Sequence, residues 1–325
     1  MGGAAERVVV LRALGLGDLL AAVPALRGLR RGLPGHRLLL AAPAWLAPVA
    51  ALTGAVDELL PAAAPGRAVP ARIPWTGPPP EHAVDLHGSG PASLVPLRAL
   101  RPRRLYGYAH PDGPRWRPEE HERDCWCRLL AWYGLPADPA DVRIAAPAEP
   151  SPAPDATVLH PGADAAARRW PAERFAAVAR ELRAAGRPIV LTAGPGEEPL
   201  ARRVAALAGL PPGSVVSGLS LPRLAALVAG AAAVVAGDTG VAHLATAFGT
   251  PSVVLFGPVA PHRWGPPRTA RHRVLWHPGA HPGGRPGDPH GRTPDPRLLR
   301  IAPAEVLAAL AALPAPWQVR AGPPP

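Results

Sequence analysis

One polar turn of this chain, Gly237-Asp238-Thr239-Gly240, stands between two apolar runs at 231–236 and 251–256. Both runs have strand character, and the residues after Gly240 favour a helix. A turn of this kind presents free backbone N–H groups at the positive end of the helix dipole. It therefore suits an anion, most obviously a phosphate. The alternative is that Asp238 or Thr239 serves only as a helix N-cap.

A second polar turn, Leu14-Gly15-Leu16-Gly17-Asp18, follows an apolar strand at 7–12 and leads into a helix over 19–31. A dinucleotide-binding fingerprint needs a third glycine three residues after Gly17, where Leu20 stands. The turn thus argues against a dehydrogenase. It places the Asp18 carboxylate at the carboxyl end of a strand, where it can act as a general base. The simpler alternative is again an N-cap.

Two further turns carry charge. His160-Pro161-Gly162-Ala163 ends a strand at 157–160 and leads to Arg168-Arg169, just before a helix that we expect to begin at Pro171. Paired guanidinium groups beside a helix N-terminus suit a phosphate or diphosphate. The alternative is that both arginines are surface charges that face solvent and bind no ligand. Glu197 follows a glycine turn and can accept hydrogen bonds from ribose hydroxyls, or complement a helix dipole.

The elements that position these turns alternate between strands and helices. Strands are predicted at 7–12, 36–40, 56–60, 83–86, 104–108, 157–160, 188–191, 215–216, 231–236 and 251–256. Helices are predicted at 19–31, 44–52, 119–133, 171–185, 197–207, 221–229 and 302–313. A stretch rich in proline and alanine, 135–155, reads as a linker, and 277–296 as a loop. This order predicts an α/β protein with two Rossmann-like domains facing a shared cleft.

Composition limits the classes of function. The 325 residues are 48% hydrophobic and 18% charged, which is typical of a soluble globular protein. The net charge of +11 comes from arginine alone, and these arginines are scattered along the chain, so we expect no nucleic-acid partner. Peripheral contact with an anionic membrane surface stays open. No membrane-spanning run or signal peptide is evident, so we predict a cytoplasmic protein. Cys125 and Cys127 are expected to point to different faces of a helix, so we predict no disulfide between them.

Together these motifs resemble glycosyltransferase family 9, the ADP-heptose:lipopolysaccharide heptosyltransferases, over nearly the whole chain. The resemblance is carried by the turn at 14–18 with Val23-Pro24-Ala25-Leu26, by the turn at 160–163 with Arg169-Trp170-Pro171, and above all by the unbroken block 237–258. It implies a GT-B fold, with an N-terminal acceptor domain at 1–145, a C-terminal donor domain at 146–315 and a disordered tail at 316–325.

The resemblance also implies an activity. The expected reaction is inverting and needs neither a metal nor a cofactor. It moves a sugar, expected to be a heptose on an ADP-linked donor, to a glycan, lipid-linked or metabolite acceptor, as in lipopolysaccharide core biosynthesis.

Individual residues acquire roles from the same resemblance. Asp18 falls on the catalytic base and Asp238 on the residue that contacts the donor sugar. Arg168 stands where the family commonly carries a lysine, a departure that keeps the positive charge. The remaining expectations are Arg169, Thr239 and Gly240 for the donor phosphates, Glu197 for the ribose, and Gly15, Gly17, His160, Gly162 and His243 as further cleft residues.

Two other interpretations remain open. The same fold could house a nucleotide-sugar epimerase or hydrolase, which needs no acceptor. It could also be a degenerate nucleotide-binding scaffold, although such a copy would be free to lose Asp18, Arg168 or Asp238. The late histidines His272, His277, His281 and His290 lack the spacing of a metal site.

Overall fold

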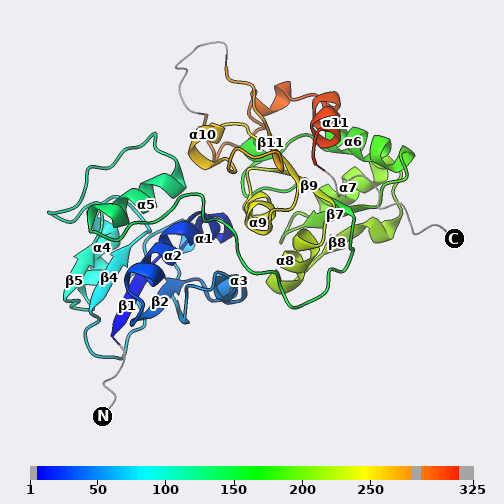
Figure 1. The fold of residues 1–325 in the computed structure, drawn as a ribbon. Coiled ribbons are helices and arrows are strands. Elements are labelled where there is room, and N and C mark those ends of the chain that lie inside the picture. The colour runs from blue at the N-terminus through cyan, green and yellow to red at the C-terminus, as the bar shows by residue number, and fades with distance from the viewer. Residues whose placement is uncertain (1–5, 280–286, 315–325) are drawn as a thin grey trace. The chain divides into compact units, whose positions relative to one another are not determined.

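The computed structural model describes residues 6–279 and 287–314, and it divides the chain into two compact units, Met1–Ala145 and Ala146–Pro325. Each unit contains a parallel β-sheet with helices packed against it (Figure 1). The tail expected to be disordered, 316–325, lies outside the described residues, as does part of the segment 277–296.

The sheet of the first unit has the strand order β3-β2-β1-β4-β5, and all of its pairings are parallel. The strands are β1 (Arg7–Leu11), β2 (Arg37–Ala42), β3 (Glu58–Pro61), β4 (His82–Asp85) and β5 (Arg104–Tyr106). Strand β1 lies between β2 and β4, with Val9 opposite both Leu39 and Ala83. The strand order reverses between β1 and β4, so their carboxyl ends form the place where open α/β sheets bind ligands.

The helices of the first unit are α1 (Leu16–Ala21), α2 (Val23–Gly32), α3 (Ala47–Leu52), α4 (Pro91–Arg98) and α5 (Glu122–Trp132). The single helix predicted over 19–31 is therefore wrong, because the backbone breaks at Ala22, just before Pro24 at the start of α2. Proline cannot donate a helical hydrogen bond, so it is tolerated only in a first turn. Helix α4 was not predicted, and it contains Pro96. No helix or strand lies within the predicted linker 135–155.

The sheet of the second unit has the order β11-β10-β9-β6-β7-β8, again with parallel pairings. Its strands are β6 (Thr157–His160), β7 (Ile189–Ala193), β8 (Val215–Ser217), β9 (Ala233–Gly237), β10 (Ser252–Leu255) and β11 (His272–Leu275). Strand β11 was not predicted. Here the order reverses between β6 and β9, and this pair of strand ends is the second place suited to a ligand.

The helices of the second unit are α6 (Ala172–Ala184), α7 (Glu198–Ala208), α8 (Leu221–Ala229), α9 (Gly240–Phe248), α10 (Pro261–Trp264) and α11 (Pro303–Ala311). Pro171 is the N-cap of α6 and not its first residue. The core of this unit is centred on Trp170 and Phe175, whose rings meet edge to face with centroids 5.0 Å apart.

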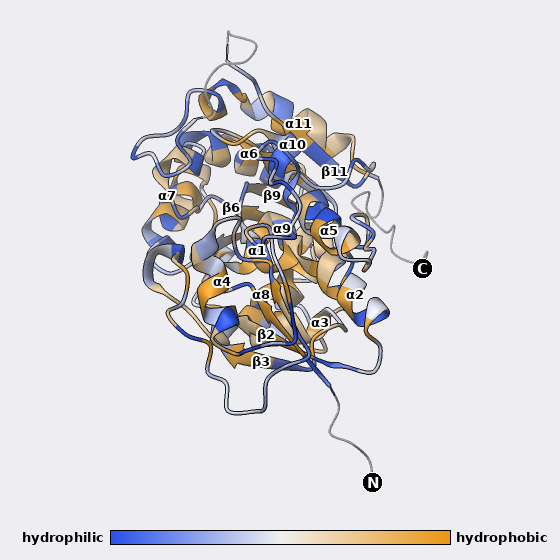
Figure 2. Cartoon of the chain, turned by 90° about the vertical axis from the view of Figure 1, so that its left-hand side faces the viewer, coloured by the Kyte–Doolittle hydropathy of each residue, from blue (hydrophilic) through white to orange (hydrophobic). Residues whose placement is uncertain are grey.

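Hydropathy follows the layers of the fold. The strands are largely hydrophobic, as β2 illustrates, while several helices carry both hydrophobic and hydrophilic residues (Figure 2). In the described part of the chain, no helix combines the length and apolar character needed to cross a bilayer. Cys125 and Cys127 are both free cysteines and both buried.

Candidate active site

Asp18 lies in the first turn of α1, at the carboxyl end of β1. Its helical position is the third, and Gly15 is the N-cap, so Asp18 is not an N-cap itself. The Asp18 Oδ2 atom accepts a hydrogen bond from the Gly15 backbone N–H at 3.1 Å, which is the back-bonding half of a capping box. Only 6% of the Asp18 side chain is exposed. The carboxylate therefore contributes to the turn as well as carrying a charge.

Two arginines flank this carboxylate. Arg67 places its Nη2 atom 2.6 Å from Asp18 Oδ2, and Arg12 places its Nη2 atom 3.7 Å from Oδ1. The Arg12 Nε–H also donates to the Asp18 backbone carbonyl at 3.1 Å. The two arginines differ in exposure: 46% of the Arg67 side chain is exposed, and 1% of the Arg12 side chain. One ion pair is thus open to solvent, and the other is sealed in the unit.

Arg12 is the centre of a buried polar network. Its Nη2–H donates to Glu122 Oε1 at 2.7 Å, and the guanidinium lies 5.0 Å from the Trp126 ring centroid. The Trp126 Nε1–H donates to the same Glu122 oxygen at 2.8 Å. A buried charge is stable only when it is paired and hydrogen-bonded. From the sequence, Arg12 was predicted only as the end of the strand at 7–12, and the signal for its role is a charge directly after a fully apolar run.

The end of β4, next to β1, carries two further titratable groups that the sequence analysis did not identify. Asp85 is fully buried and accepts the backbone N–H of His87 at 2.9 Å and of Gly88 at 3.3 Å, and the Ser93 hydroxyl donates to its other oxygen. Burial raises the pKa of Asp85 to about 6. Burial, together with the charge of Arg12, lowers the pKa of His87 to about 4. Asp85 thereby fixes the turn that presents His87.

In the second unit, the turn after β9 leads into α9, as predicted. Thr239 is the N-cap of α9, and its Oγ1 atom is buried with no hydrogen-bond partner among the described residues. Arg168 reaches this turn, because its Nη1–H donates to the Asp238 backbone carbonyl at 3.3 Å. The Arg168 Nε atom is likewise buried without a partner in the described part of the chain. A guanidinium and a helix N-terminus thus lie together with polar atoms still unsatisfied.

Arg169 points elsewhere. Its Nε–H donates to the Ala163 backbone carbonyl at 2.9 Å, which ties it to the turn after β6. The neighbouring Trp170 is buried, and its Nε1–H donates to the Ile301 carbonyl at 3.1 Å. Of the two arginines expected at the phosphates, Arg168 is therefore the one that contacts the Asp238 turn directly.

His160, Gly162 and Glu197 form one compact group at the ends of β6 and β7. His160 Nδ1 lies 3.0 Å from the Thr192 hydroxyl, and its Nε2 lies 3.9 Å from Glu197 Oε2. Burial lowers the pKa of His160. The same Glu197 oxygen accepts the Gly194 N–H at 2.8 Å. A Cβ atom on Gly162 would lie 2.0 Å from Glu197 Oε2, so the carboxylate occupies space that only glycine leaves free.

His243 and Gly240 complete the set in the first turns of α9. His243 Nε2 lies 3.8 Å from Asp238 Oδ1, and the His243 ring meets Trp264 edge to face. The structure thus gathers the predicted residues into two groups. Gly15, Gly17 and Asp18 lie at the β1 end of the first unit, and the other nine lie at the ends of β6, β7 and β9 in the second.

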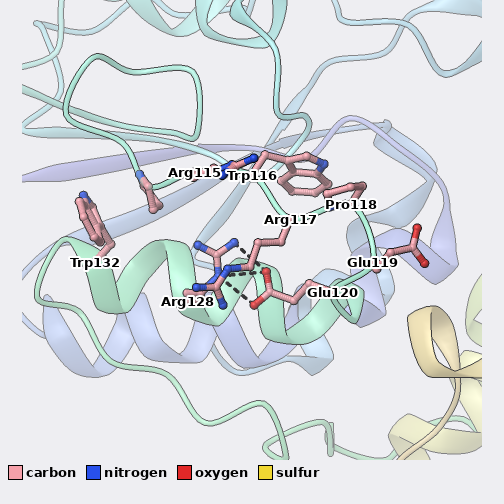
Figure 3. A pocket seen from close by; sticks show the side chains of 9 residues that line it. Arg115, Trp116, Arg117, Pro118, Glu119, Glu120, Arg128 and Trp132 are labelled. Carbon is pink, nitrogen blue, oxygen red and sulfur yellow. Dashed lines mark hydrogen bonds and ion pairs between the residues drawn. The ribbon is translucent and has the colours of Figure 1, made fainter.

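A separate pocket of about 840 Å³ lies on the first unit, along the segment between β5 and α5 (Figure 3). Arg128 and Glu120 form a two-pronged ion pair in it, with N–O distances of 2.7–2.9 Å. Arg115 and Arg117 are exposed on its rim. None of the predicted site residues lines this pocket.

The described residues contain no group of three or more His, Cys, Asp or Glu side chains arranged to hold a metal ion. His272 lies 2.9 Å from the Ser252 hydroxyl, and His277 lies 2.8 Å from Glu305. His281 falls outside the described part of the chain.

Two parallel-sheet α/β units, each with polar residues at its strand-order reversal, are typical of the GT-B class of glycosyltransferase folds. Solved structures of this class superpose on most of the chain. A glycosyl transferase family 9 protein from Veillonella parvula has a TM-score of 0.75 and 20% identity, covering 95% of this chain and 97% of its own. The ADP-heptose lipopolysaccharide heptosyltransferase II of Escherichia coli has a TM-score of 0.69 and 21% identity, covering 94% of this chain and 98% of its own.

Sequence comparison finds a similar family. Residues 137–284 match the model of glycosyltransferase family 9 (heptosyltransferase). It is 34% identical over 163 residues to lipopolysaccharide heptosyltransferase 1 of Pseudomonas aeruginosa. This match covers 49% of the chain and 44% of the relative, so the chain spans less than half of the relative's length.

Proposed function

We propose that this protein transfers a heptose from ADP-heptose to a sugar hydroxyl of a lipopolysaccharide-type core acceptor, with inversion and without a metal ion. The observation that carries this proposal is the meeting of Arg168 with the Asp238-Thr239 turn at the N-terminus of α9. Unsatisfied donors at a helix N-terminus, beside a guanidinium, suit the diphosphate of a nucleotide sugar. The proposed donor, ADP-heptose, and the proposed type of acceptor, lipopolysaccharide, are taken from the names of the similar heptosyltransferases.

The second unit would bind the donor. Glycosyl transfer breaks the bond between the anomeric carbon and the diphosphate oxygen, and negative charge develops on the departing nucleoside diphosphate. Fixed N–H groups of α9 and the Arg168 guanidinium would stabilise that charge in the transition state. The Asp238 carboxylate would accept hydrogen bonds from donor-sugar hydroxyls, and Glu197 from the ribose. Arg168 and the helix supply positive charge of the kind that a divalent cation supplies in other transferases.

The first unit would supply the base. The acceptor hydroxyl oxygen forms the new bond to the anomeric carbon on the face opposite the leaving diphosphate, which inverts the configuration. Its proton passes to an Asp18 carboxylate oxygen. Arg67 holds Oδ2, and Oδ1 lies at a longer distance from Arg12.

The proposal is tested by separating donor binding from transfer. Titration calorimetry with ADP, ADP-heptose, UDP-glucose and GDP-mannose gives the donor preference, and we expect ADP-heptose to bind most tightly. Incubation with ADP-heptose and a deacylated lipopolysaccharide core oligosaccharide, followed by mass spectrometry, should then show an added heptose. Conversion of ADP-heptose to an epimer or to free heptose, with or without acceptor, would identify an epimerase or hydrolase instead. Binding without any product would indicate a scaffold.

A further inference from the structure

The imidazole of His87 has a fixed orientation at the end of β4. Its Nδ1 atom accepts the backbone N–H of Ala13 at 3.2 Å. A backbone N–H can only donate, so Nδ1 carries no proton and the neutral ring bears its hydrogen on Nε2. The structure thus determines the tautomer through a single hydrogen bond.

The turn that carries His87 is fixed by hydrogen bonds to the buried Asp85 carboxylate. Asp85 accepts the backbone N–H groups of His87 and Gly88, and the Ser93 hydroxyl donates to the same carboxyl. Asp85 and Ser93 are both buried. Hydrogen bonds that an aspartate accepts from the backbone N–H groups following it are a standard way to set a tight turn. A buried, fully bonded aspartate therefore positions one half-buried imidazole.

The outward edge of that imidazole has no partner among the residues that the structure describes. Across the described residues, the side-chain hydrogen bond of His87 is the one at Nδ1, and Nε2 is not among the buried unsatisfied atoms. The Nε2–H therefore meets solvent. Its surroundings are charged, because Arg12, Asp18 and Arg67 all act electrostatically on the ring. Strands β1 and β4 are neighbours, so this donor stands at the same strand ends as the proposed base.

We propose that His87 is an acceptor-binding residue whose Nε2–H donates a hydrogen bond to an oxygen of the acceptor sugar next to the reacting hydroxyl. The inference rests on the proposed function, because it takes Asp18 as the base. A neutral imidazole with one fixed N–H can donate but cannot take the hydroxyl proton at Nε2, so it does not compete with Asp18. It adds orientation: the hydroxyl faces Asp18 when its neighbouring oxygen is held by His87. The lowered pKa of His87 keeps this donor neutral at physiological pH.

Two substitutions separate the two edges of the ring. His87→Asn keeps an oxygen near the Nδ1 position, where it can accept the Ala13 N–H, but it removes the outward donor. His87→Gln brings an amide N–H near the Nε2 position. We expect the acceptor KM to rise about 3- to 10-fold in His87→Asn, the range for one lost hydrogen bond. His87→Gln should restore most of that loss, and both variants should keep the wild-type affinity for ADP-heptose. His110→Gln, on the segment after β5, is the matched control and should change neither quantity.

A readout that does not depend on turnover completes the test. In protein labelled with ¹⁵N-histidine, His87 should show a protonated Nε2 and an unprotonated Nδ1 at pH 7, and the Nε2 signal should shift when the deacylated core oligosaccharide is added. A protonated Nδ1 overturns the inference, as does an unchanged acceptor KM in His87→Asn. Transfer without a shift of the Nε2 signal contradicts the role of His87 alone. A shift without transfer contradicts the proposed function alone, and the absence of both contradicts the two together.

Discussion

The Arg67 Nη2 atom lies 2.6 Å from Asp18 Oδ2, while the other oxygen of the same carboxylate faces Arg12 at 3.7 Å. One aspartate is thus shared by a half-exposed guanidinium and a buried one. Exposed ion pairs contribute little to stability because solvent screens them. Breaking a buried pair is costly because it leaves the remaining charge uncompensated. The two arginines should therefore differ sharply when each is removed.

We expect Arg67→Ala to lower the free energy of unfolding by no more than about 1 kcal/mol, and Arg12→Met to lower it by about 3–5 kcal/mol. The methionine roughly fills the volume but leaves Glu122 and Asp18 without their buried cation. Urea unfolding followed by circular dichroism measures both changes. Equal losses in the two variants would show that Arg12 is not the organising charge of the first unit.

Asp85 and His87 should give stability profiles of opposite slope. The pKa of Asp85 rises from 3.8 to about 6 on folding, so its contribution is full below pH 3.8 and is lost as the pH rises through 6. The pKa of His87 falls from 6.5 to about 4, so its contribution is full above pH 6.5 and is lost as the pH falls through 4. Each shift of roughly two units corresponds to a few kcal/mol. In the wild-type protein the two largely cancel between pH 4 and 6.

Single substitutions should expose the separate slopes. Relative to wild type, Asp85→Asn should become more stable as the pH rises from 4 to 6, because only the His87 term remains. His87→Gln should become less stable over the same interval. Chemical unfolding at several pH values gives both differences, and other titrating groups drop out of the comparison with wild type. Parallel profiles for all three proteins would contradict the burial of these two groups.

Apolar periodicity predicted most of the fold. The long buried strands and the amphipathic helices of both units follow directly from it, since their patterns are strong over several residues. It failed at Ala22 and at α4, where proline makes local sequence ambiguous. It also missed β11, whose residues His272–Leu275 include two polar side chains. Within the described part of the chain, strand β11 pairs only with β10, so its position at the sheet edge decides its conformation more than its own residues do.

The sequence predicted the turns of the candidate site, but it did not predict all of the residues that the structure places there. Asp18 and the turn at 237–240 stand out because glycine and polar residues interrupt apolar runs. Arg12 and Arg67 come from separate segments, and the path of the chain after β3 brings Arg67 to the carboxylate that Arg12 also faces. The pairing of β1 with β4 places His87 at the neighbouring strand end. Such convergence depends on tertiary structure. The resemblance to a known family gave the expected roles of the candidate residues, and the structure shows which residues contact them.

Arg168 and Arg169 provide a matched pair for the donor site. We expect Arg168→Ala to weaken ADP binding by about 1–3 kcal/mol, because it removes a charged hydrogen-bond donor beside α9. Arg169→Ala should weaken binding less, since the Arg169 Nε–H is already bonded to the Ala163 carbonyl. Calorimetry with ADP measures both. Unchanged ADP binding in Arg168→Ala would remove this residue from the donor site, and a larger effect at Arg169 would reverse the assignment.

Asp18→Asn separates the structural role of this residue from its proposed chemistry. The asparagine oxygen can still accept the Gly15 N–H, so the turn before α1 should persist, and Arg12 keeps its partner Glu122. The amide cannot accept a proton, so we expect transfer to fall by about 10²- to 10⁴-fold. Affinity for ADP-heptose should not change, because the residues proposed to bind the donor lie in the second unit. Steady-state transfer rates and calorimetry on the same preparation give both values. Near-normal transfer by a folded Asp18→Asn protein would show that the carboxylate only stabilises the turn, and the base would then have to be sought among the other groups at the β1 and β4 ends.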